Sequence, residues 1–364
     1  MLFLTSYYSK NKGTTDFFTD YLVARKIPFF MIMLPLDPGN KIKVYQSKES
    51  VSCIKQIGSP NHFIFAQIWN FIYIFTAIFS KRKEITSYIG FGSVTLLPAL
   101  LLKRFGLRRK IVFYGVDFSQ KRFSSELLNN IYRIIEKIVV RGADLTISVT
   151  KRAEDERIKL GLKKDRSLVI SNGVNTELLS QRQGIDFSRD LHLIFWGSIT
   201  EQSGLLKFIK ENEQVLQKVS LDIIGDGPLK SRILALIKDM PKISFLGSMD
   251  LKSIGNYINK LKCPCFGIAP YDSKHNDHVY FGDSLKIKEY LLFDLPYIVS
   301  SDGYLSEDIK EFGFAYKSSK ELTEFLNKGK VFCRQFVQSR EKRINILNKY
   351  SWDNLFNDLM EKIG

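Results

Sequence analysis

The 364-residue chain is longer than one hydrophobic core usually supports, so we expect two α/β domains with a cleft between them. Hydrophobic residues at 45% and charged residues at 25% exclude a disordered chain and a polytopic membrane protein. The net charge of +16 favours anionic partners, but nucleic acid is not expected because zinc-finger, RNP and basic heptad patterns are missing. Four scattered cysteines predict neither a disulfide framework nor a zinc site.

The first half of the chain alternates predicted strands and helices, as in a parallel, doubly wound sheet. After the first strand, a polar loop through Gly13 and Thr14 leads into a helix over 16–25. Apolar residues recur at helical spacing over 127–141. We expect one Rossmann-like domain over residues 1–172. Its expected strands lie at 2–5, 111–114, 145–149 and 168–171.

Two apolar stretches of this half are followed by basic clusters. Phe63–Phe79 is shorter than the roughly 20 apolar residues that comfortably cross a bilayer, and a Lys-Arg-Lys run follows closely. Val94–Leu102 runs into a second basic cluster over 103–110. Apolar surface beside basic clusters is typical of proteins that lie on an anionic leaflet. We therefore expect a protein without a secretory signal, cytoplasmic and peripheral on the inner face of the cell membrane. The alternative is two core helices with solvated basic residues.

The second half begins with a polar stretch over 173–189, which is the best linker candidate. A second alternation of strands and helices follows and predicts another Rossmann-like domain over 190–350. Ser351 is a plausible N-cap for a last amphipathic helix, 351–364. The expected strands of the second domain lie at 191–196, 221–224, 243–245, 266–269 and 297–300.

Two motifs in the second domain point to phosphate chemistry. Gly225, Asp226 and Gly227 form a glycine turn between a predicted strand and helix, where backbone N–H groups can approach a phosphate. A plain strand-to-helix turn explains it about as well. Further on, Lys286 and Glu289 share one helical face, so that lysine could meet a phosphate while glutamate accepts ribose hydroxyls. A surface ion pair is the simpler interpretation of such a pair in isolation.

Taken in order, the motifs resemble those of GT-B glycosyltransferases of bacterial surface-polysaccharide assembly, the group 1-like and family 4-like proteins. The resemblance covers nearly the whole chain and rests on four motifs: Asn172-Gly173-Val174-Asn175, Phe195-Trp196-Gly197-Ser198, Gly225-Asp226-Gly227-Pro228 and Lys286 to Pro296. It implies a GT-B fold, with two Rossmann-like doubly wound domains facing each other across a cleft. The final helix would pack back on the first domain.

The resemblance also implies a donor site in the second domain. A nucleoside-diphosphate sugar, UDP-sugar being favoured, would place its ribose on Glu289 and its diphosphate near Lys286. The other residues expected to line this site are Gly197, Ser198, Gly225, Asp226, Gly227, Asp283, Ser284 and Leu285. One position departs from the pattern of retaining members: Phe281 replaces a second glutamate, and Asp283 is the nearest carboxylate. The stereochemical outcome therefore stays open.

The first domain is expected to hold the acceptor. Asp117 follows a strand, at the edge of the sheet where ligands of α/β domains bind, and is a candidate general base. Capping the next segment is its alternative role. Gly13, Thr14, Tyr114 and Arg122 are the candidate acceptor-binding residues. Since no DxD-type metal motif is present, we expect no cofactor and no metal, with Lys, Arg and helix dipoles carrying the diphosphate charge.

The function expected from these features is transfer of a sugar to a lipid-linked or saccharide acceptor. A sugar-nucleotide epimerase of GT-B fold is an alternative, but it would need no apolar and basic segments in its first domain. A scaffold protein that kept the fold and lost catalysis is a second alternative, motivated by the missing glutamate at Phe281.

Overall fold

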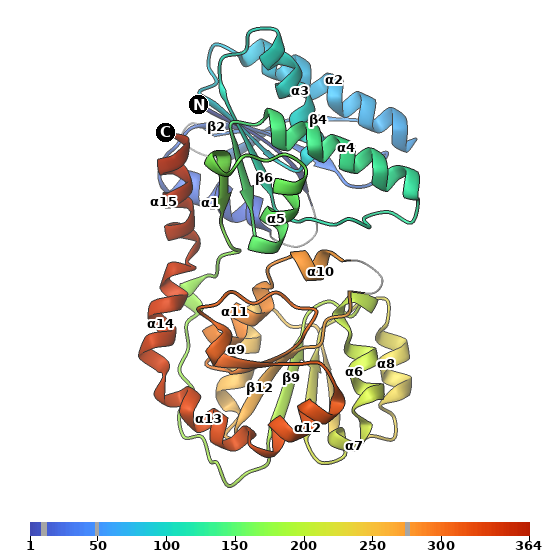
Figure 1. Ribbon diagram of the computed structural model, residues 1–364, viewed down its shortest axis with the longest axis vertical. Helices are drawn as coiled ribbons and strands as arrows, with labels where there is room; N and C mark the ends of the chain where they lie inside the picture. The colour runs from blue at the N-terminus through green and yellow to red at the C-terminus, as the bar shows by residue number, and fades with distance from the viewer. Residues whose placement is uncertain (9–12, 48–50, 274–276) are drawn as a thin grey trace. The chain divides into compact units, whose positions relative to one another are not determined.

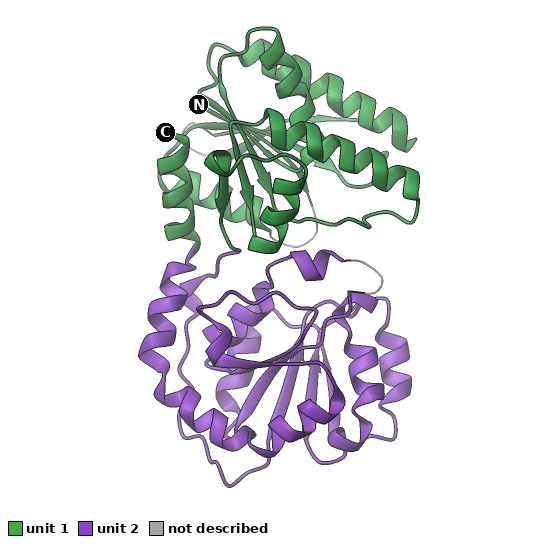
Figure 2. Cartoon of the chain, in the orientation of Figure 1, with its two compact units in different colours: residues 1–171, 352–364 green, residues 172–351 purple. Residues whose placement is uncertain are grey.

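The computed structural model describes residues 1–8, 13–47, 51–273 and 277–364. These residues form two compact units (Figure 2). Unit 1 contains Met1–Ser171 together with Trp352–Gly364, and unit 2 contains Asn172–Ser351. The chain therefore returns to unit 1 with its last helix.

Unit 1 is built on a sheet of eight strands in the order β4-β3-β2-β1-β5-β6-β7-β8. All neighbours pair in parallel except β3, which runs antiparallel to both β2 and β4. The strands are β1 Leu2–Tyr8, β2 Phe29–Pro35, β3 Ile42–Ser47, β4 Val51–Ile57, β5 Ser87–Phe91, β6 Lys110–Gly115, β7 Leu145–Ser148 and β8 Ser167–Val169. The sequence did not reveal the β3–β4 pair, because the mixed polar and apolar residues of this exposed edge carry no clear alternation.

Helices cover both faces of this sheet (Figure 1). On one face α3 packs between α2 and α4, and on the other α1 packs against α15. Alternate residues of β5 serve the two layers: Tyr88 belongs to the core under α2, α3 and α4, while Phe91 contacts Phe18 of α1. The helices are α1 Thr14–Ala24, α2 Phe63–Lys81, α3 Ser93–Arg104, α4 Glu126–Gly142, α5 Lys151–Lys159 and α15 Trp352–Ile363.

The two apolar stretches of unit 1 have different environments. α3 is largely buried and belongs to the core. α2 buries only one face, through Ala66, Asn70, Ile74 and Ile78. Within the described part of the chain, α2 is the one helix whose length and composition would suffice to cross a membrane.

Unit 2 is an all-parallel sheet of six strands in the order β11-β10-β9-β12-β13-β14. Its strands are β9 His192–Trp196, β10 Ser220–Ile224, β11 Ile243–Gly247, β12 Cys265–Ala269, β13 Tyr297–Ser300 and β14 Gly313–Tyr316. Its helices are α6 Leu205–Glu211, α7 Glu213–Leu216, α8 Lys230–Leu236, α9 Leu251–Lys260, α10 His278–Phe281, α11 Leu285–Leu292, α12 Ser319–Asn327, α13 Gly329–Gln338 and α14 Arg340–Lys349. Apolar clusters lie on both faces of this sheet.

The segment 173–189, expected as a linker, lies in unit 2. Arg182 is buried there, and its guanidinium donates to the carbonyl oxygens of Leu261 at 3.0 Å and Cys263 at 2.6 Å. Its backbone N–H donates to Asp294 at 3.1 Å. Polar composition suggested a solvated connection, but these polar groups are used inside the unit.

Candidate functional site

The predicted donor residues gather at the carboxyl edge of the unit 2 sheet. β9, β10 and β11 follow one another in one direction across the sheet, and β12, β13 and β14 in the other. The order therefore reverses between β9 and β12, and such a switch point is where ligands of open α/β sheets bind. Trp196 ends β9, Tyr271 follows β12, and α11 begins at Leu285.

The glycines of this edge allow two strand ends to approach each other closely. A Cβ on Gly225 would lie 2.0 Å from the carbonyl oxygen of Gly197, and one on Gly227 would lie 2.4 Å from that of Ile199. Both residues also have positive φ, at 153° and 158°. The N–H groups of Gly197 and Gly225 donate to Ile224 and Gly247 at 3.0 and 2.8 Å, so they are not directed at a phosphate. The N–H of Gly225 thus does not have the phosphate-donor role expected of its turn, and the glycines shape the site by allowing this close approach.

Lys286 lies in the first turn of α11 and faces aromatic rings. Its Nζ lies 4.1 Å from the ring centre of Phe195 and 5.6 Å from that of Tyr271. A Cβ on Gly197 would touch the end of this lysine at 3.1 Å, so glycine leaves room for it. Burial lowers the pKa of Lys286 to about 8, although the negative charge of Glu289 acts to raise it. A half-buried ammonium group held over aromatic rings is suited to an anion.

Glu289 lies one turn further along α11 and is held in place by Trp196. The indole Nε1 of Trp196 donates to Glu289 Oε2 at 2.9 Å, and its ring packs edge-on against Tyr290 with centroids 4.2 Å apart. Burial raises the pKa of Glu289, while the Trp196 hydrogen bond and Lys286 lower it. The indole uses one carboxylate oxygen, and the other remains as an acceptor for a ligand hydroxyl.

The opening of α11 supplies further polar groups. The side chain of Ser284 does not cap the helix; its hydroxyl pairs with that of Tyr271, whose pKa burial raises to about 12. The N–H groups at the start of α11 therefore have no cap from Ser284, and a helix N-terminus of this kind favours an anion. Leu285 is the first residue of this turn.

Asp283 has a different environment from the one expected for a donor-binding residue. Its carboxylate forms a buried ion pair with Lys288 and accepts the backbone N–H of Asn172 at 2.7 Å. Lys288 also donates to the carbonyl oxygen of Asn172 at 2.6 Å. Asp283 thus ties the start of unit 2 to α11, and its carboxylate does not replace the glutamate missing at Phe281, a residue that is itself buried.

Ser198 and Asp226 lie at the rim of this site. Ser198 is exposed, and Asp226 pairs with Lys230 at 3.6 Å while accepting the N–H of Gly227 at 2.8 Å. Sequence reasoning missed Trp196 and Tyr271 as parts of the site. An aromatic residue directly before a glycine turn was the available signal for Trp196, whereas nothing near Tyr271 in the sequence distinguished it.

In unit 1, Asp117 lies directly after β6 and its carboxylate is engaged. Arg122 Nη2 donates to Asp117 Oδ1 at 2.7 Å, and the Asp117 side chain remains 47% exposed. Burial lowers the pKa of Arg122, but the charges of Asp117 and Tyr132 raise it by more, so that the pKa of Arg122 lies above its ordinary value. The guanidinium also lies over the Tyr132 ring of α4 at 4.6 Å. Asp117 is therefore a fixed carboxylate that solvent, or an acceptor, can reach.

The backbone of this loop is anchored by a fully buried arginine that sequence reasoning missed. Arg157 of α5 donates to the carbonyl oxygen of Asp117 at 2.8 Å, to Glu136 Oε1 at 2.9 Å and to Ser148 Oγ at 2.9 Å. A Cβ on Gly115 would lie 2.2 Å from the guanidinium, so glycine is needed for this approach. Arg157 is therefore a positioning residue for the Asp117 loop.

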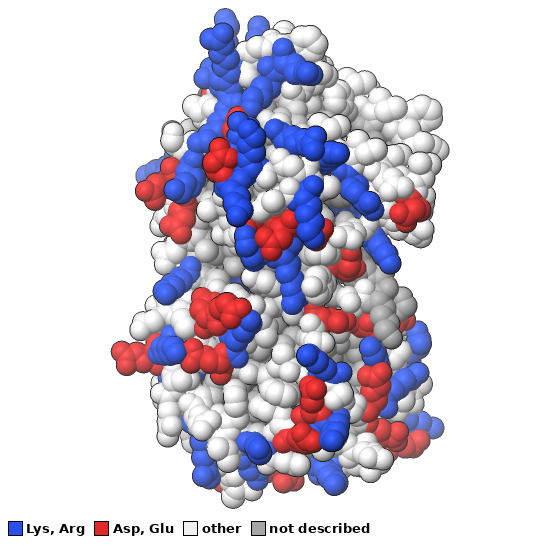
Figure 3. Space-filling model, in the orientation of Figure 1, with Lys and Arg blue, Asp and Glu red and all other residues white. Residues whose placement is uncertain are grey.

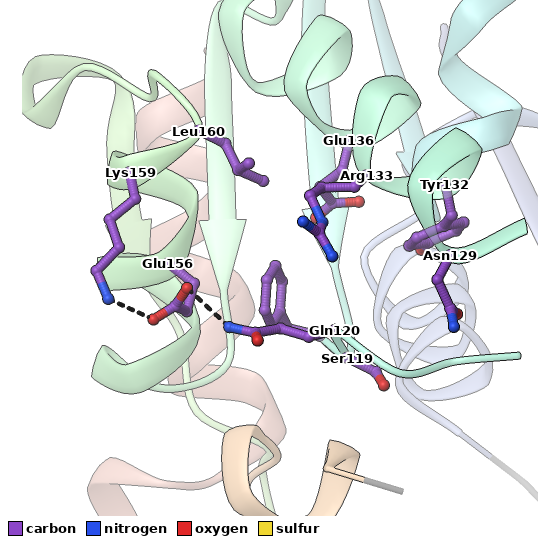
Figure 4. A pocket seen from close by; sticks show the side chains of 10 residues that line it. Ser119, Gln120, Asn129, Tyr132, Arg133, Glu136, Glu156, Lys159 and Leu160 are labelled. Atoms are coloured by element: carbon purple, nitrogen blue, oxygen red, sulfur yellow. Dashed lines mark hydrogen bonds and ion pairs between the residues drawn. The ribbon is translucent and has the colours of Figure 1, made fainter. Parts of the chain in front are cut away.

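A pocket of about 230 Å³ lies beside this loop, between α4 and α5 (Figure 4). Glu156 joins two of its lining residues, accepting from Gln120 at 3.0 Å and from Lys159 at 2.6 Å. Arg133 and Glu136 of α4 line it as well, so both signs of charge are present. The predicted acceptor residues Gly13, Thr14, Tyr114 and Arg122 do not line it.

Arg122 lies on the Asp117 loop beside this pocket, whereas Gly13, Thr14 and Tyr114 belong to other segments of unit 1. Gly13 precedes α1, and its N–H donates to Asp16 at 2.8 Å, while Thr14 begins that helix. Tyr114 is fully buried, with its ring stacked on Phe91 at 5.0 Å. The side chain of Tyr114 is a core group and cannot contact an acceptor, which corrects the role expected of it.

No group of three or more His, Cys, Asp and Glu side chains in the described ranges is arranged to hold a metal ion.

Neither the protein-family models nor the curated proteins include a match to this sequence. Solved structures do match it along its whole length. Sucrose-phosphate synthase from Thermosynechococcus elongatus superposes with a TM-score of 0.73 at 14% identity, covering 100% of this chain and 99% of that one. HepE from Anabaena in complex with UDP gives 0.69 at 14% identity, with the same coverage. The lipopolysaccharide outer core galactosyltransferase WaaB gives 0.71 at 12% identity, again over 100% and 99%.

The chain therefore has the GT-B fold, and the predicted α/β class with two Rossmann-like domains is confirmed. At these identities the likeness establishes the architecture, while the chemistry depends on the residues described above.

Proposed function

We propose that this chain of GT-B fold is a glycosyltransferase that moves a sugar from a nucleoside-diphosphate sugar to a lipid-linked or saccharide acceptor. We further propose that the enzyme is cytoplasmic and acts in the assembly of bacterial cell-surface polysaccharides. Its main support is the arrangement at the switch point of unit 2: Lys286 over aromatic rings, Glu289 held by Trp196, and the start of α11. A cation beside a carboxylate oxygen that can accept hydroxyl groups suits a nucleotide diphosphate, which carries phosphate charge and ribose hydroxyls.

In this proposal the donor is oriented by three contacts. Lys286 and the N-terminus of α11 hold the diphosphate and stabilise its charge as it leaves. The free oxygen of Glu289 accepts the ribose hydroxyls, while Trp196 keeps the carboxylate in position. UDP is the favoured nucleotide; HepE, one of the structural neighbours, was solved with UDP and with UDP-glucose. We expect catalysis without a resident metal or cofactor.

The acceptor is proposed to bind to unit 1, where Asp117 would take the proton from its hydroxyl in an inverting reaction or orient it in a retaining one. Arg122 fixes the carboxylate, and Arg157 fixes the loop that carries it. Phe281 and the paired Asp283 supply no second carboxylate for the donor sugar.

The proposal is tested by titrating the full chain with UDP, GDP and dTDP by calorimetry, and then by measuring transfer from the corresponding sugars with bacterial membrane lipid extract. We expect one nucleotide to bind, and transfer from its sugar to require the extract. Glu289→Ala should weaken binding by about tenfold to a hundredfold, since it removes hydrogen bonds to a charged group.

Glu324→Ala serves as the matched control, because Glu324 is an exposed helical glutamate on α12. Equal nucleotide affinity of the Glu289 and Glu324 variants would refute the donor site. Nucleotide binding without transfer from any of the sugars would favour the scaffold alternative.

A further inference from the structure

Helix α4 carries apolar residues on both its inner and its outer face. Its buried positions are Asn129, Glu136, Val139 and Val140, and a stripe of apolar residues is exposed on the opposite side. The stripe consists of Leu127 at 69% exposure, Ile131 at 45%, Ile134 at 59% and Ile138 at 50%. Residues at this spacing form one face of a helix. An apolar face of this kind on the outside of a folded domain indicates a partner.

Helix α2 has a similar outward face. Ile74 and Ile78 on its inner face belong to the core of unit 1, and the opposite face exposes a series of large apolar residues. That series consists of Phe63, Ile64, Phe65, Ile68, Trp69, Ile72 and Phe79. Because α3 packs against both α2 and α4, the three helices form one layer on the sheet. We refer to the exposed apolar residues of α2 and α4 as the apolar helix surface.

Basic side chains border this surface. Between residues 61 and 142 the sequence has thirteen Lys and Arg but only four Asp and Glu. Lys137 and Arg141 lie along α4 beside its apolar stripe, and both are exposed. Figure 3 shows Lys and Arg side chains gathered over unit 1, next to a largely white area over the right-hand ends of α2 and α4.

A groove at the carboxyl-terminal ends of α2 and α3 combines the two chemistries. It has a volume of about 390 Å³ and is lined by Phe79 and Phe105 together with Arg82, Arg108 and Arg109. Phe105 is 77% exposed, and Arg82 lies over the Phe79 ring at 4.1 Å. Three guanidinium groups next to exposed aromatic rings suit a phosphate whose attached chains are apolar, as in a phospholipid.

We propose that the apolar helix surface docks unit 1 on an anionic lipid bilayer, with the apolar residues of α2 and α4 among the acyl chains and the bordering arginines and lysines on lipid phosphates. The excess of positive charge around the surface favours this occupant over a second copy of the chain, because two copies would bring like charges together. α2 lies in the interface and does not cross it, because its inner face is part of the unit 1 core.

The docking surface and the candidate acceptor loop share helix α4. On the side of α4 away from the apolar stripe, Asn129 bonds the backbone N–H and carbonyl of Phe123 at 2.8 and 2.9 Å, and Tyr132 lies under Arg122. A helix is only about 10 Å across. Docking would therefore hold the Asp117 loop within reach of an acceptor anchored in the bilayer. This part of the inference rests on the proposed function and assigns it a lipid-linked acceptor.

The test is co-sedimentation of the full chain with vesicles of phosphatidylglycerol and phosphatidylethanolamine, compared with vesicles of phosphatidylcholine alone. The wild type should bind the anionic vesicles more strongly. Ile131→Glu combined with Ile134→Glu should reduce the partition coefficient by about tenfold or more, because two apolar side chains no longer leave water. Leu234→Glu combined with Val331→Glu, at exposed apolar positions of unit 2, makes the same charge change and should bind as the wild type does.

The charge component is tested with Arg108→Gln combined with Arg109→Gln. Binding to anionic vesicles should fall by about tenfold or more, because each basic residue near the surface contributes severalfold. The pair Lys320→Gln and Lys328→Gln, exposed in unit 2, is the control.

Two results would overturn the proposal: a wild type that stays in the supernatant with anionic vesicles, or a variant of the α4 pair that sediments as the wild type does. Sedimentation velocity tests the other occupant. If the wild type is a dimer and Ile131→Glu combined with Ile134→Glu makes it a monomer, the surface binds a second copy of the chain instead. Nucleotide titration without vesicles separates this inference from the proposed function, because the α4 pair should leave nucleotide affinity unchanged.

Discussion

The carboxyl edges of the two sheets hold their charged side chains in opposite ways. In unit 2, the ammonium group of Lys286 lies over the rings of Phe195 and Tyr271 and its pKa is lowered by burial. In unit 1, the carboxylate of Asp117 is already paired with Arg122, and its backbone is fixed by Arg157. The buried lysine of unit 2 would be stabilised by an arriving anion. The aspartate of unit 1 already has its counter-charge and needs no ligand to hold it in place. In the proposed function, the edge of unit 2 would bind a charge and the edge of unit 1 would position a reactive group.

The sharpest test of this contrast is Asp117→Asn. We expect transfer to fall by about a hundredfold to ten-thousandfold, since an amide cannot accept the proton of the acceptor hydroxyl. Nucleotide affinity, measured by calorimetry on the same preparation, should not change. A variant that loses nucleotide affinity along with transfer would contradict the division of roles between the two units.

Arg157→Met tests whether the Asp117 loop is held by a buried charge. Removing the guanidinium leaves Glu136 buried without its partner, so the free energy of unfolding should drop by about 3–5 kcal/mol in urea denaturation. Glu136→Met combined with Arg157→Met removes both charges and should recover part of this loss. If the single variant is as stable as the wild type, the pair does not anchor the loop.

Gly225→Ala tests the close approach of strand ends in unit 2. A methyl group 2.0 Å from the carbonyl oxygen of Gly197, at a φ of 153°, should destabilise the protein by about 1–3 kcal/mol and weaken nucleotide binding. Gly247→Ala is the control: its φ is also positive, at 74°, but open space surrounds its Cβ position, so only the smaller backbone cost applies. Equal losses in the two variants would show that the contact with Gly197 is unimportant.

The pH dependence of nucleotide binding reports on Lys286. Its pKa of about 8 lies below the ordinary value because burial disfavours the charged form. Binding of a diphosphate requires the protonated lysine, so affinity should be constant below pH 8 and then fall by up to about tenfold per pH unit above it. Lys286→Arg stays charged and should show no such fall in calorimetric titrations between pH 7 and 9.5. A wild-type profile as flat as that of the arginine variant would place the diphosphate elsewhere.

Much of the molecule followed from local sequence patterns. Strands such as 221–224 and 297–300 were found because continuous apolar runs between turn residues mark buried parallel strands. Lys286 and Glu289 were predicted as a pair because residues three apart share a helical face. Strands β2 and β5 were not assigned, and β14 was missed as well, because short apolar runs do not distinguish strand from helix.

Other residues acquired their roles only in the folded chain. Three side-chain pairs join different elements or the two sides of a turn, and nothing in the local sequence specifies the partners. They are Asp283 with Lys288, Arg157 with Glu136, and Trp196 with Glu289. The amino-acid sequence was enough to predict the class of fold, the alternation of strands and helices and the helix that carries the donor candidates, because periodicity and turn chemistry act over a few residues. The tertiary structure alone decided which polar groups are buried and paired, that Tyr114 lies in the core, and that the apolar stripe of α4 faces outward. Burial and pairing depend on which segments meet in space, and a periodic pattern records the face of a helix without recording what lies against it.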